Sequence, residues 1–132
     1  GHFIMPHYPY LYDSAGNTLG YKQAMNTADQ HTYLEYLQYC NEFFLQLIDK
    51  VQKRDPNSTI VLMSDHGFTK YNDPQLLQYN FHNFISIYYP DKEYSELPDT
   101  LTNVNLFRTI FNKQFGLNLP DLPHREIPLI EK

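Results

Sequence analysis

Two adjacent residues, Asp65 and His66, are the strongest candidates for chemistry in this sequence. They follow a short apolar run at 59–63 that predicts a strand, and ligands bind at the carboxyl ends of strands in open α/β sheets. A carboxylate oxygen and an imidazole nitrogen together suit Zn²⁺ or Mn²⁺ better than the all-oxygen cages of Ca²⁺ or Mg²⁺. Adjacent side chains of a regular strand point to opposite faces, so one ion can contact both only where the backbone breaks, which Gly67 permits.

The same tripeptide, residues 65–67, has a second interpretation as an ordinary turn that ends a strand. Asp and Gly are both common turn residues, and this alone accounts for their presence. Two ligands also do not complete a metal site, so at least one or two more must come from elsewhere. The tripeptide by itself leaves both interpretations open.

Two further histidines are candidates for binding an anionic substrate. His7 lies between Pro6 and Pro9, which restrict the backbone around it, so its ring could be held ready for a hydrogen bond to a substrate oxygen. His82 precedes the second predicted strand and could return to the same end of the sheet as Asp65. The remaining histidines are interpreted as loop or solvated residues: His2, His31 and His124.

The most regular pattern in the chain predicts one long helix over about residues 28–54. Thr27 and Gln30 have the spacing of a capping box, and apolar residues then recur at steps of three and four. Residues 1–25 before this helix are expected to be irregular, with a turn at 13–17.

The rest of the chain predicts two strands and a second helix. The run at 59–63 lacks alternation, which is typical of a strand covered on both faces in a parallel sheet, and 83–89 is the second strand. Thr102 or Asn103 can cap a last helix, which Gly116 closes at a C′ position before an extended tail at 117–132. The fold class is therefore α/β, and because two strands leave two open edges, the chain is expected to be part of a larger sheet.

Composition favours one compact, soluble domain. The 132 residues are 42% hydrophobic and 19% charged, which is enough to bury a core. The net charge is -5 with scattered acids, so no basic face exists to bind nucleic acid. The longest apolar run is far below the roughly 20 residues of a membrane helix. The single cysteine, Cys40, lies on the apolar stripe of the long helix and is interpreted as a core residue rather than a nucleophile.

The order helix, strand, Ser64-Asp65-His66-Gly67, together with the upstream segment Pro6-His7-Tyr8-Pro9-Tyr10, resembles the C-terminal half of the alkaline phosphatase and sulfatase superfamily. It is most similar to the sulfatase-like hydrolases and transferases that include lipoteichoic acid synthases and phosphoethanolamine transferases. Residues 83–90 and 104–108 are similar to the closing strand and helix of that family. The resemblance covers roughly residues 2–116. It implies that residues 1–132 are a single partial domain, the C-terminal portion of an alkaline phosphatase-like α/β/α sandwich.

The resemblance also implies roles for individual residues. Asp65 and His66 would be metal ligands, His7 would bind the transferred phosphoryl or sulfuryl group, and His82 would be a further substrate-side histidine. The metal would be Mn²⁺ or Zn²⁺, with Ca²⁺ or Mg²⁺ as alternatives, and it would bind this chain weakly or not at all. The nucleophile and the other acidic ligands would come from the N-terminal half of the same domain, so this chain would contain no catalytic nucleophile.

The complete protein implied by this resemblance is an extracytoplasmic part of a bacterial membrane-anchored enzyme acting on phosphate or sulfate esters, as a hydrolase or a headgroup transferase. The chain alone would be inactive, and it could self-associate to cover its sheet edges. Two other functions stay open. One is a non-catalytic module derived from the same fold that binds glycans or lipid headgroups. The other is a self-sufficient structural domain built on aromatic packing.

Overall fold

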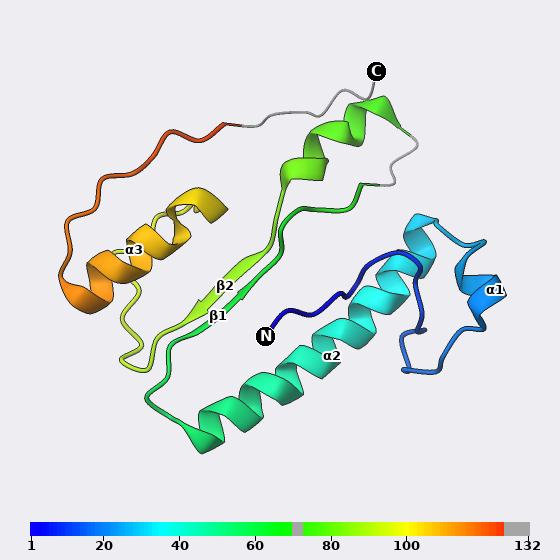
Figure 1. Cartoon of the computed structure of the whole chain (residues 1–132), viewed down its shortest axis with the longest axis horizontal. Helices are drawn as coiled ribbons and strands as arrows, with labels where there is room; N and C mark the ends of the chain where they lie inside the picture. Colours follow the sequence, from blue (N-terminus) through cyan, green and yellow to red (C-terminus); the bar gives the residue numbers. More distant parts are fainter. Residues whose placement is uncertain (70–72, 126–132) are drawn as a thin grey trace. The chain divides into compact units, whose positions relative to one another are not determined.

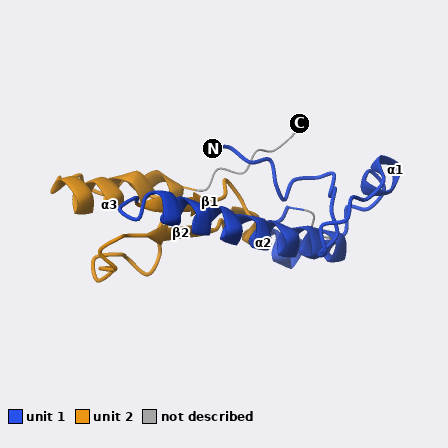
Figure 2. Ribbon diagram, turned by 90° about the horizontal axis from the view of Figure 1, so that it is seen from below, with its two compact units in different colours: residues 1–58, 68–77 blue, residues 59–67, 78–132 orange. Residues whose placement is uncertain are grey.

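The computed structural model describes residues 1–69 and 73–125, which form two compact units. Unit 1 contains residues 1–58 and 68–77, and unit 2 contains residues 59–67 and the chain from residue 78 onward (Figure 2). The mixture of helices with a two-stranded sheet is broadly α/β, as predicted (Figure 1). The elements are, in order, helix α1 (Tyr21–Ala24), helix α2 (Gln30–Arg54), strand β1 (Ile60–Met63), the 3₁₀ helix η1 (Pro74–Phe81), strand β2 (Ile85–Tyr88) and helix α3 (Asn103–Phe115).

The long helix α2 ends at Arg54 as predicted, but the predicted capping residue is wrong. Asp29, not Thr27, is the N-cap, because its carboxylate accepts hydrogen bonds from both the amide (2.8 Å) and the hydroxyl (3.1 Å) of Thr32. These bonds hold the pKa of Asp29 below its usual value. The hydroxyl of Thr27 instead donates to the carbonyl of Gln23 in α1 (3.0 Å). A carboxylate that reaches the helix amides directly thus defines the start of the helix.

The N-terminal segment contains the predicted turn and one helix that was not predicted. The carboxylate of Asp13 accepts hydrogen bonds from the amides of Ala15 and Asn17, so the turn at 13–17 is confirmed. Gly16 has a φ of 81°, and a Cβ there would lie 2.8 Å from the ring of Tyr39, so any larger residue would be strained at this position. The short helix α1 lies within the stretch expected to be irregular.

Unit 1 is organised around buried aromatic side chains of α2 and the N-terminal segment. Its buried core is Tyr10, Tyr36, Cys40 and Phe68. Six half-buried residues pack against it: Met5, Tyr8, Tyr12, Tyr33, Tyr39 and Phe44. Burial raises the pKa of Tyr36 to about 12 and that of Cys40 to about 11. The interpretation of Cys40 as a core residue is therefore confirmed.

In unit 2, β1 and β2 pair antiparallel over four residues each, from Ile60 opposite Tyr88 to Met63 opposite Ile85. The predicted parallel environment of β1 is therefore wrong. The connection between the two strands, residues 64–84, is long enough for a parallel crossover, but it returns the chain so that β2 runs beside β1 in the opposite direction. β1 is half-buried rather than covered on both faces, since the Met63 side chain is 39% exposed.

Helix α3 follows the predicted boundaries, and Gly116 ends it in the left-handed region with a φ of 61°. The tail after it is extended along the helix, held by two asparagines seven residues apart. Asn112 exchanges hydrogen bonds with the backbone of Leu119 (3.0 and 2.8 Å), and Asn105 does the same with Leu122 (2.9 Å each). The part of the predicted tail at 126–132 lies outside the described residues.

Candidate functional site

The turn that carries the candidate residues begins at Ser64, which is held by several hydrogen bonds. Its amide donates to the carbonyl of Phe84 (2.9 Å), and its hydroxyl accepts from the Phe84 amide (2.8 Å). Its carbonyl accepts from the side-chain amides of Asn103 (3.1 Å) and Asn83 (3.5 Å). The end of β1 is thus anchored to the start of β2 and to the first residue of α3.

The turn ends at Gly67, which is equally constrained. Its amide donates to the carbonyl of Asn80 (3.0 Å). A Cβ at this position would lie 2.5 Å from the carbonyl oxygen of His82 and 2.6 Å from that of Tyr79. Because both obstacles are backbone atoms, no larger residue fits without moving the chain. Gly67 therefore allows the backbone of the turn to pack closely against the backbone at Tyr79 and His82, in addition to forming the turn that the sequence suggested.

Between these two anchors, Asp65 and His66 present their side chains to the same side. Oδ2 of Asp65 lies 3.9 Å from Nε2 of His66, and the two side chains are 91% and 52% exposed. The other carboxylate oxygen, Oδ1, accepts the backbone amide of His66 (3.0 Å). In a regular strand these side chains would point apart, so the backbone break expected from the sequence is present.

The hydrogen bonds of His66 define which ring nitrogen is available. Nδ1 lies 2.6 Å from the carbonyl oxygen of Gly67. Because a carbonyl can only accept, Nδ1 carries the proton, and in the neutral ring Nε2 keeps its lone pair. That nitrogen faces the carboxylate of Asp65. An exposed oxygen and an exposed lone pair thus meet at the end of β1.

This spacing fits two ligands of one ion. Two atoms that are each about 2.1 Å from a tetrahedral metal lie about 3.4 Å apart, so a small side-chain rotation brings this pair to the required separation. The nitrogen and oxygen donors suit Zn²⁺ or Mn²⁺. Among residues 1–69 and 73–125, no group of three or more His, Cys, Asp or Glu side chains is arranged to hold a metal.

The structure brings the backbone of His82 to the turn, because its carbonyl lies against Gly67. The His82 ring packs edge-on against the ring of Tyr79, with centroids 5.0 Å apart. His82 therefore belongs to the same unit as Asp65 and His66, which agrees with its expected return to this end of the sheet. Its role toward a substrate stays a prediction.

His7 belongs to unit 1, so its expected approach to Asp65 and His66 stays a prediction. Its ring is exposed, and Nδ1 is hydrogen-bonded to the carbonyl of Tyr8. The peptide bonds before Pro6 and Pro9 are both cis. Since Nδ1 donates to a carbonyl, Nε2 of His7 can donate to a substrate oxygen only when the ring is protonated.

Sequence reasoning missed the two asparagines that anchor the turn. Asn83 donates to the side-chain oxygen of Asn103, and Asn103 donates to the carbonyl of Ser64. In the sequence, Asn103 was noticed only as a capping residue and Asn83 only as the start of a strand. An asparagine at the start of α3 and another two residues before β2 are the signal that could have suggested a shared partner.

Comparisons with known proteins do not assign the chain to a family. No helix of the described residues is both long and apolar enough to cross a membrane. No protein-family model, curated protein or solved structure shows significant similarity to the chain, so the resemblance to sulfatase-like enzymes stays a prediction.

Proposed function

We propose that this chain is the C-terminal part of the catalytic domain of a metal-dependent sulfatase-like or phosphotransferase-like enzyme. In this proposal Asp65 and His66 bind the metal, and His7 and His82 contact the anionic group of a phosphate or sulfate ester. The nucleophile and the remaining acidic ligands come from another part of the same domain. The chain alone is therefore expected to bind metal weakly and to turn over no substrate.

One observation carries the proposal: Oδ2 of Asp65 and the available nitrogen of His66 lie 3.9 Å apart on an exposed turn. A turn that only ended a strand would not require an accessible donor on both side chains. It would also not require anchoring at both ends, as at Ser64 and Gly67. Metal ligands need this kind of support, since neighbouring hydrogen bonds orient them.

The residues present fit a divalent ion, although they do not complete its coordination. A metal held here would stabilise negative charge that develops on a transferred phosphoryl or sulfuryl group. Asp65 would bind through Oδ2 while Oδ1 stays hydrogen-bonded to the backbone. The bond from Nδ1 of His66 to the Gly67 carbonyl keeps Nε2 directed at the ion.

The exposed apolar surface of unit 2 supports the view that another part of a domain covers it. Four residues on one face of α3 are at least 39% exposed: Val104, Phe107, Phe111 and Phe115. The two-stranded sheet beside them has unpaired edges within the described residues. An apolar helix face and an open sheet edge are surfaces that the remaining half of an α/β domain would bury.

The alternative function is a non-catalytic glycan-binding or headgroup-binding module, which would need an exposed aromatic surface. The tyrosines of the N-terminal segment do not form an open surface of the kind that module needs. Tyr10 is buried, and Tyr8 and Tyr12 pack against the same core. The enzyme-derived proposal is therefore better supported.

Paramagnetic broadening by Mn²⁺ in NMR spectra of the purified chain tests the metal site. We expect weak binding that selectively broadens signals of residues 64–67 and that is lost in Asp65→Asn and His66→Ala. Matched controls are Asp99→Asn and His31→Ala, which remove the same groups from exposed positions elsewhere. Equal broadening in Asp65→Asn and the unchanged chain would remove Asp65 as a ligand.

Activity measurements test the second half of the proposal. The purified chain is expected to release no nitrophenol from nitrophenyl phosphate or nitrophenyl sulfate with Mn²⁺ or Zn²⁺ present. Robust turnover that is lost in Asp65→Asn would show that the site is complete in this chain. The assignment of the nucleophile to another part of the domain would then be wrong.

A further inference from the structure

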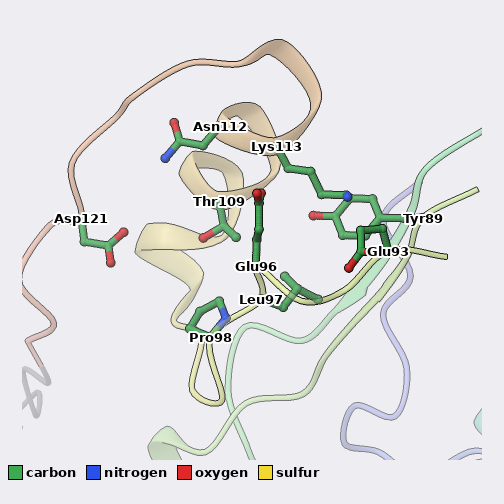
Figure 3. Close-up of a pocket in the computed structure, with 9 residues that line it drawn as sticks. All are labelled: Tyr89, Glu93, Glu96, Leu97, Pro98, Thr109, Asn112, Lys113 and Asp121. Atoms are coloured by element: carbon green, nitrogen blue, oxygen red, sulfur yellow. The ribbon is translucent and has the colours of Figure 1, made fainter. Parts of the chain in front are cut away.

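Unit 2 contains a cavity of about 310 Å³ that is separate from the turn at 64–67. Its walls are α3, the loop that follows β2, and the tail that runs back along α3 (Figure 3). This volume lies at the lower end of the range for small-molecule pockets. The cavity is therefore large enough for a molecule of several heavy atoms.

A buried hydroxyl without a hydrogen-bond partner points into this cavity. Tyr89 is only 1% exposed, and its hydroxyl has no partner among the described residues. Figure 3 shows the hydroxyl directed into the space between Lys113 and Glu96. Buried polar groups are nearly always hydrogen-bonded, so an unpaired one that lines a cavity indicates a group that enters from outside.

The charges around the cavity favour a cation. Glu93, Glu96 and Asp121 line it, and Lys113, the one cation among the described lining residues, is already paired with Asp91 at 3.1 Å. Partial burial acts to lower the pKa of Lys113, but Asp91 and the nearby glutamates outweigh this and raise it. A neutral Lys113 is therefore excluded at physiological pH, and the cavity keeps an excess of negative charge.

The carboxylates stand on different walls. Figure 3 shows Asp121 across the cavity from Glu93 and Glu96. No three described acidic, histidine or cysteine side chains converge closely enough to hold a metal ion. A bare ion would therefore contact one wall only, whereas a longer molecule with positive charge at both ends would reach both.

Both walls are held in place. The backbone on either side of Asp121 is fixed to α3, because Asn112 pairs with Leu119 and Asn105 pairs with Leu122. On the opposite wall, the carboxylate of Glu93 accepts the amide of Ser95 (2.8 Å). The backbone that carries Asp121 and the carboxylate of Glu93 are thus held in place by the fold.

We propose that this cavity binds a small organic cation with an ammonium group at each end, such as a short diamine or polyamine. One ammonium pairs with Asp121, and the other pairs with Glu96 and donates a hydrogen bond to the hydroxyl of Tyr89. This ligand satisfies the buried hydroxyl and neutralises both acidic walls. The site is independent of the metal-binding turn proposed above.

Calorimetric titration of the full chain with 1,4-diaminobutane and with spermidine tests this proposal, using 1,4-butanediol as the neutral molecule of similar length. We expect the diamine to bind about tenfold more tightly than the diol, since its hydrogen bonds are charge-assisted. Glu96→Gln and Asp121→Asn should each weaken diamine binding by about three- to fivefold. Glu42→Gln, the same change at an exposed site of α2, should leave it unaltered.

Binding measurements on Tyr89→Phe separate a ligand from water that merely fills the cavity. We expect this variant to fold normally and to lose about threefold in diamine affinity, because only the hydroxyl is removed. Equal affinity for diamine and diol would overturn the proposal. An equal loss of diamine affinity in Glu42→Gln and Glu96→Gln would also overturn it. The binding would then reflect a general attraction of the diamine to an acidic chain.

Discussion

The two units of the chain use their polar aromatic residues in opposite ways. In unit 1, Tyr10 and Tyr36 are packed among other rings, and burial raises the pKa of both hydroxyls. In unit 2, Tyr89 is just as buried, but its hydroxyl points into a polar cavity and has no partner in the described part of the chain. The same residue type thus completes a core in one unit and lines a pocket in the other.

The two units also differ in where their titratable groups lie. The buried titratable groups of unit 1 stay uncharged over the physiological range, as the raised pKa values of Tyr36 and Cys40 indicate. Unit 2 instead exposes Asp65 and His66 at the end of β1 and collects carboxylates around a cavity. Unit 1 is therefore expected to respond to mutation mainly in stability, and unit 2 mainly in ligand binding.

The largest effect should come from Tyr36→Ala in the core of unit 1. Removing a ring that is 97% buried in an aromatic cluster should cost about 3–5 kcal/mol of unfolding free energy. Urea denaturation followed by circular dichroism measures this cost. Tyr21→Ala, at a side chain that is 73% exposed, should change stability by less than about 0.5 kcal/mol. Similar costs for the two variants would mean that unit 1 has no packed core.

Gly67→Ala should have the next largest effect, and it acts on unit 2. The new methyl group meets two backbone carbonyls, so the chain must shift, at about 1–3 kcal/mol. The shift should also displace Asp65 and His66, which NMR chemical shifts of the turn would report. Gly20→Ala is the matched control, because a Cβ there meets no atom within 4 Å. An unperturbed turn in Gly67→Ala would contradict the tight packing described for it.

Asn103→Ala should have a moderate effect confined to the turn. The variant leaves the carbonyl of Ser64 with a weaker set of donors and costs about 1 kcal/mol. Mn²⁺ broadening at residues 64–67 should weaken, since the ligands lose their support. Asn26→Ala removes an exposed side-chain bond to the backbone of Lys22 and serves as the control. If both variants bind Mn²⁺ like the unchanged chain, Asn103 has no role in positioning the turn.

The smallest expected effect is a loss of unit 1 stability at alkaline pH, because this loss is nearly absent at neutral pH. The folded state raises the pKa of Cys40 from 9.0 to about 11, so it favours the protonated thiol. This contribution is fully present below pH 9 and is lost as the pH rises toward about 11. Thermal unfolding between pH 8 and 10 should therefore show a declining midpoint that Cys40→Ala flattens. An equally steep decline in Cys40→Ala would assign the effect to other groups.

Local patterns predicted the elements of this chain better than their contacts. The end of α2 at Arg54, the left-handed Gly116 after α3 and the turn at 13–17 all follow from residue types within a few positions. The cap at Asp29 was missed because Thr27 also had a suitable spacing, and only the hydrogen bonds distinguish the two. The antiparallel pairing of β1 was missed because a short apolar run does not specify its partner.

In the candidate site, too, residue types were predictable from the sequence and contacts between distant residues were not. Asp65, His66 and Gly67 were found because their types and their order after a strand suggest metal chemistry. Asn83 and Asn103 were not, because their contacts join residues far apart in the sequence. The cavity beside Tyr89 was equally hidden, since its walls come from a loop, a helix and a tail.

The sequence by itself determined which residues can do chemistry and where the long helix, the strands and the last helix lie, because both depend on residue type and local period. Only the tertiary structure decided that Asp65 and His66 face the same side and that Gly67 lies against two backbone carbonyls. It also decided that the Tyr89 hydroxyl has no partner among residues 1–69 and 73–125. These properties depend on backbone breaks and on contacts between distant segments. A residue's type and spacing do not specify which atoms of distant segments contact it in the folded chain.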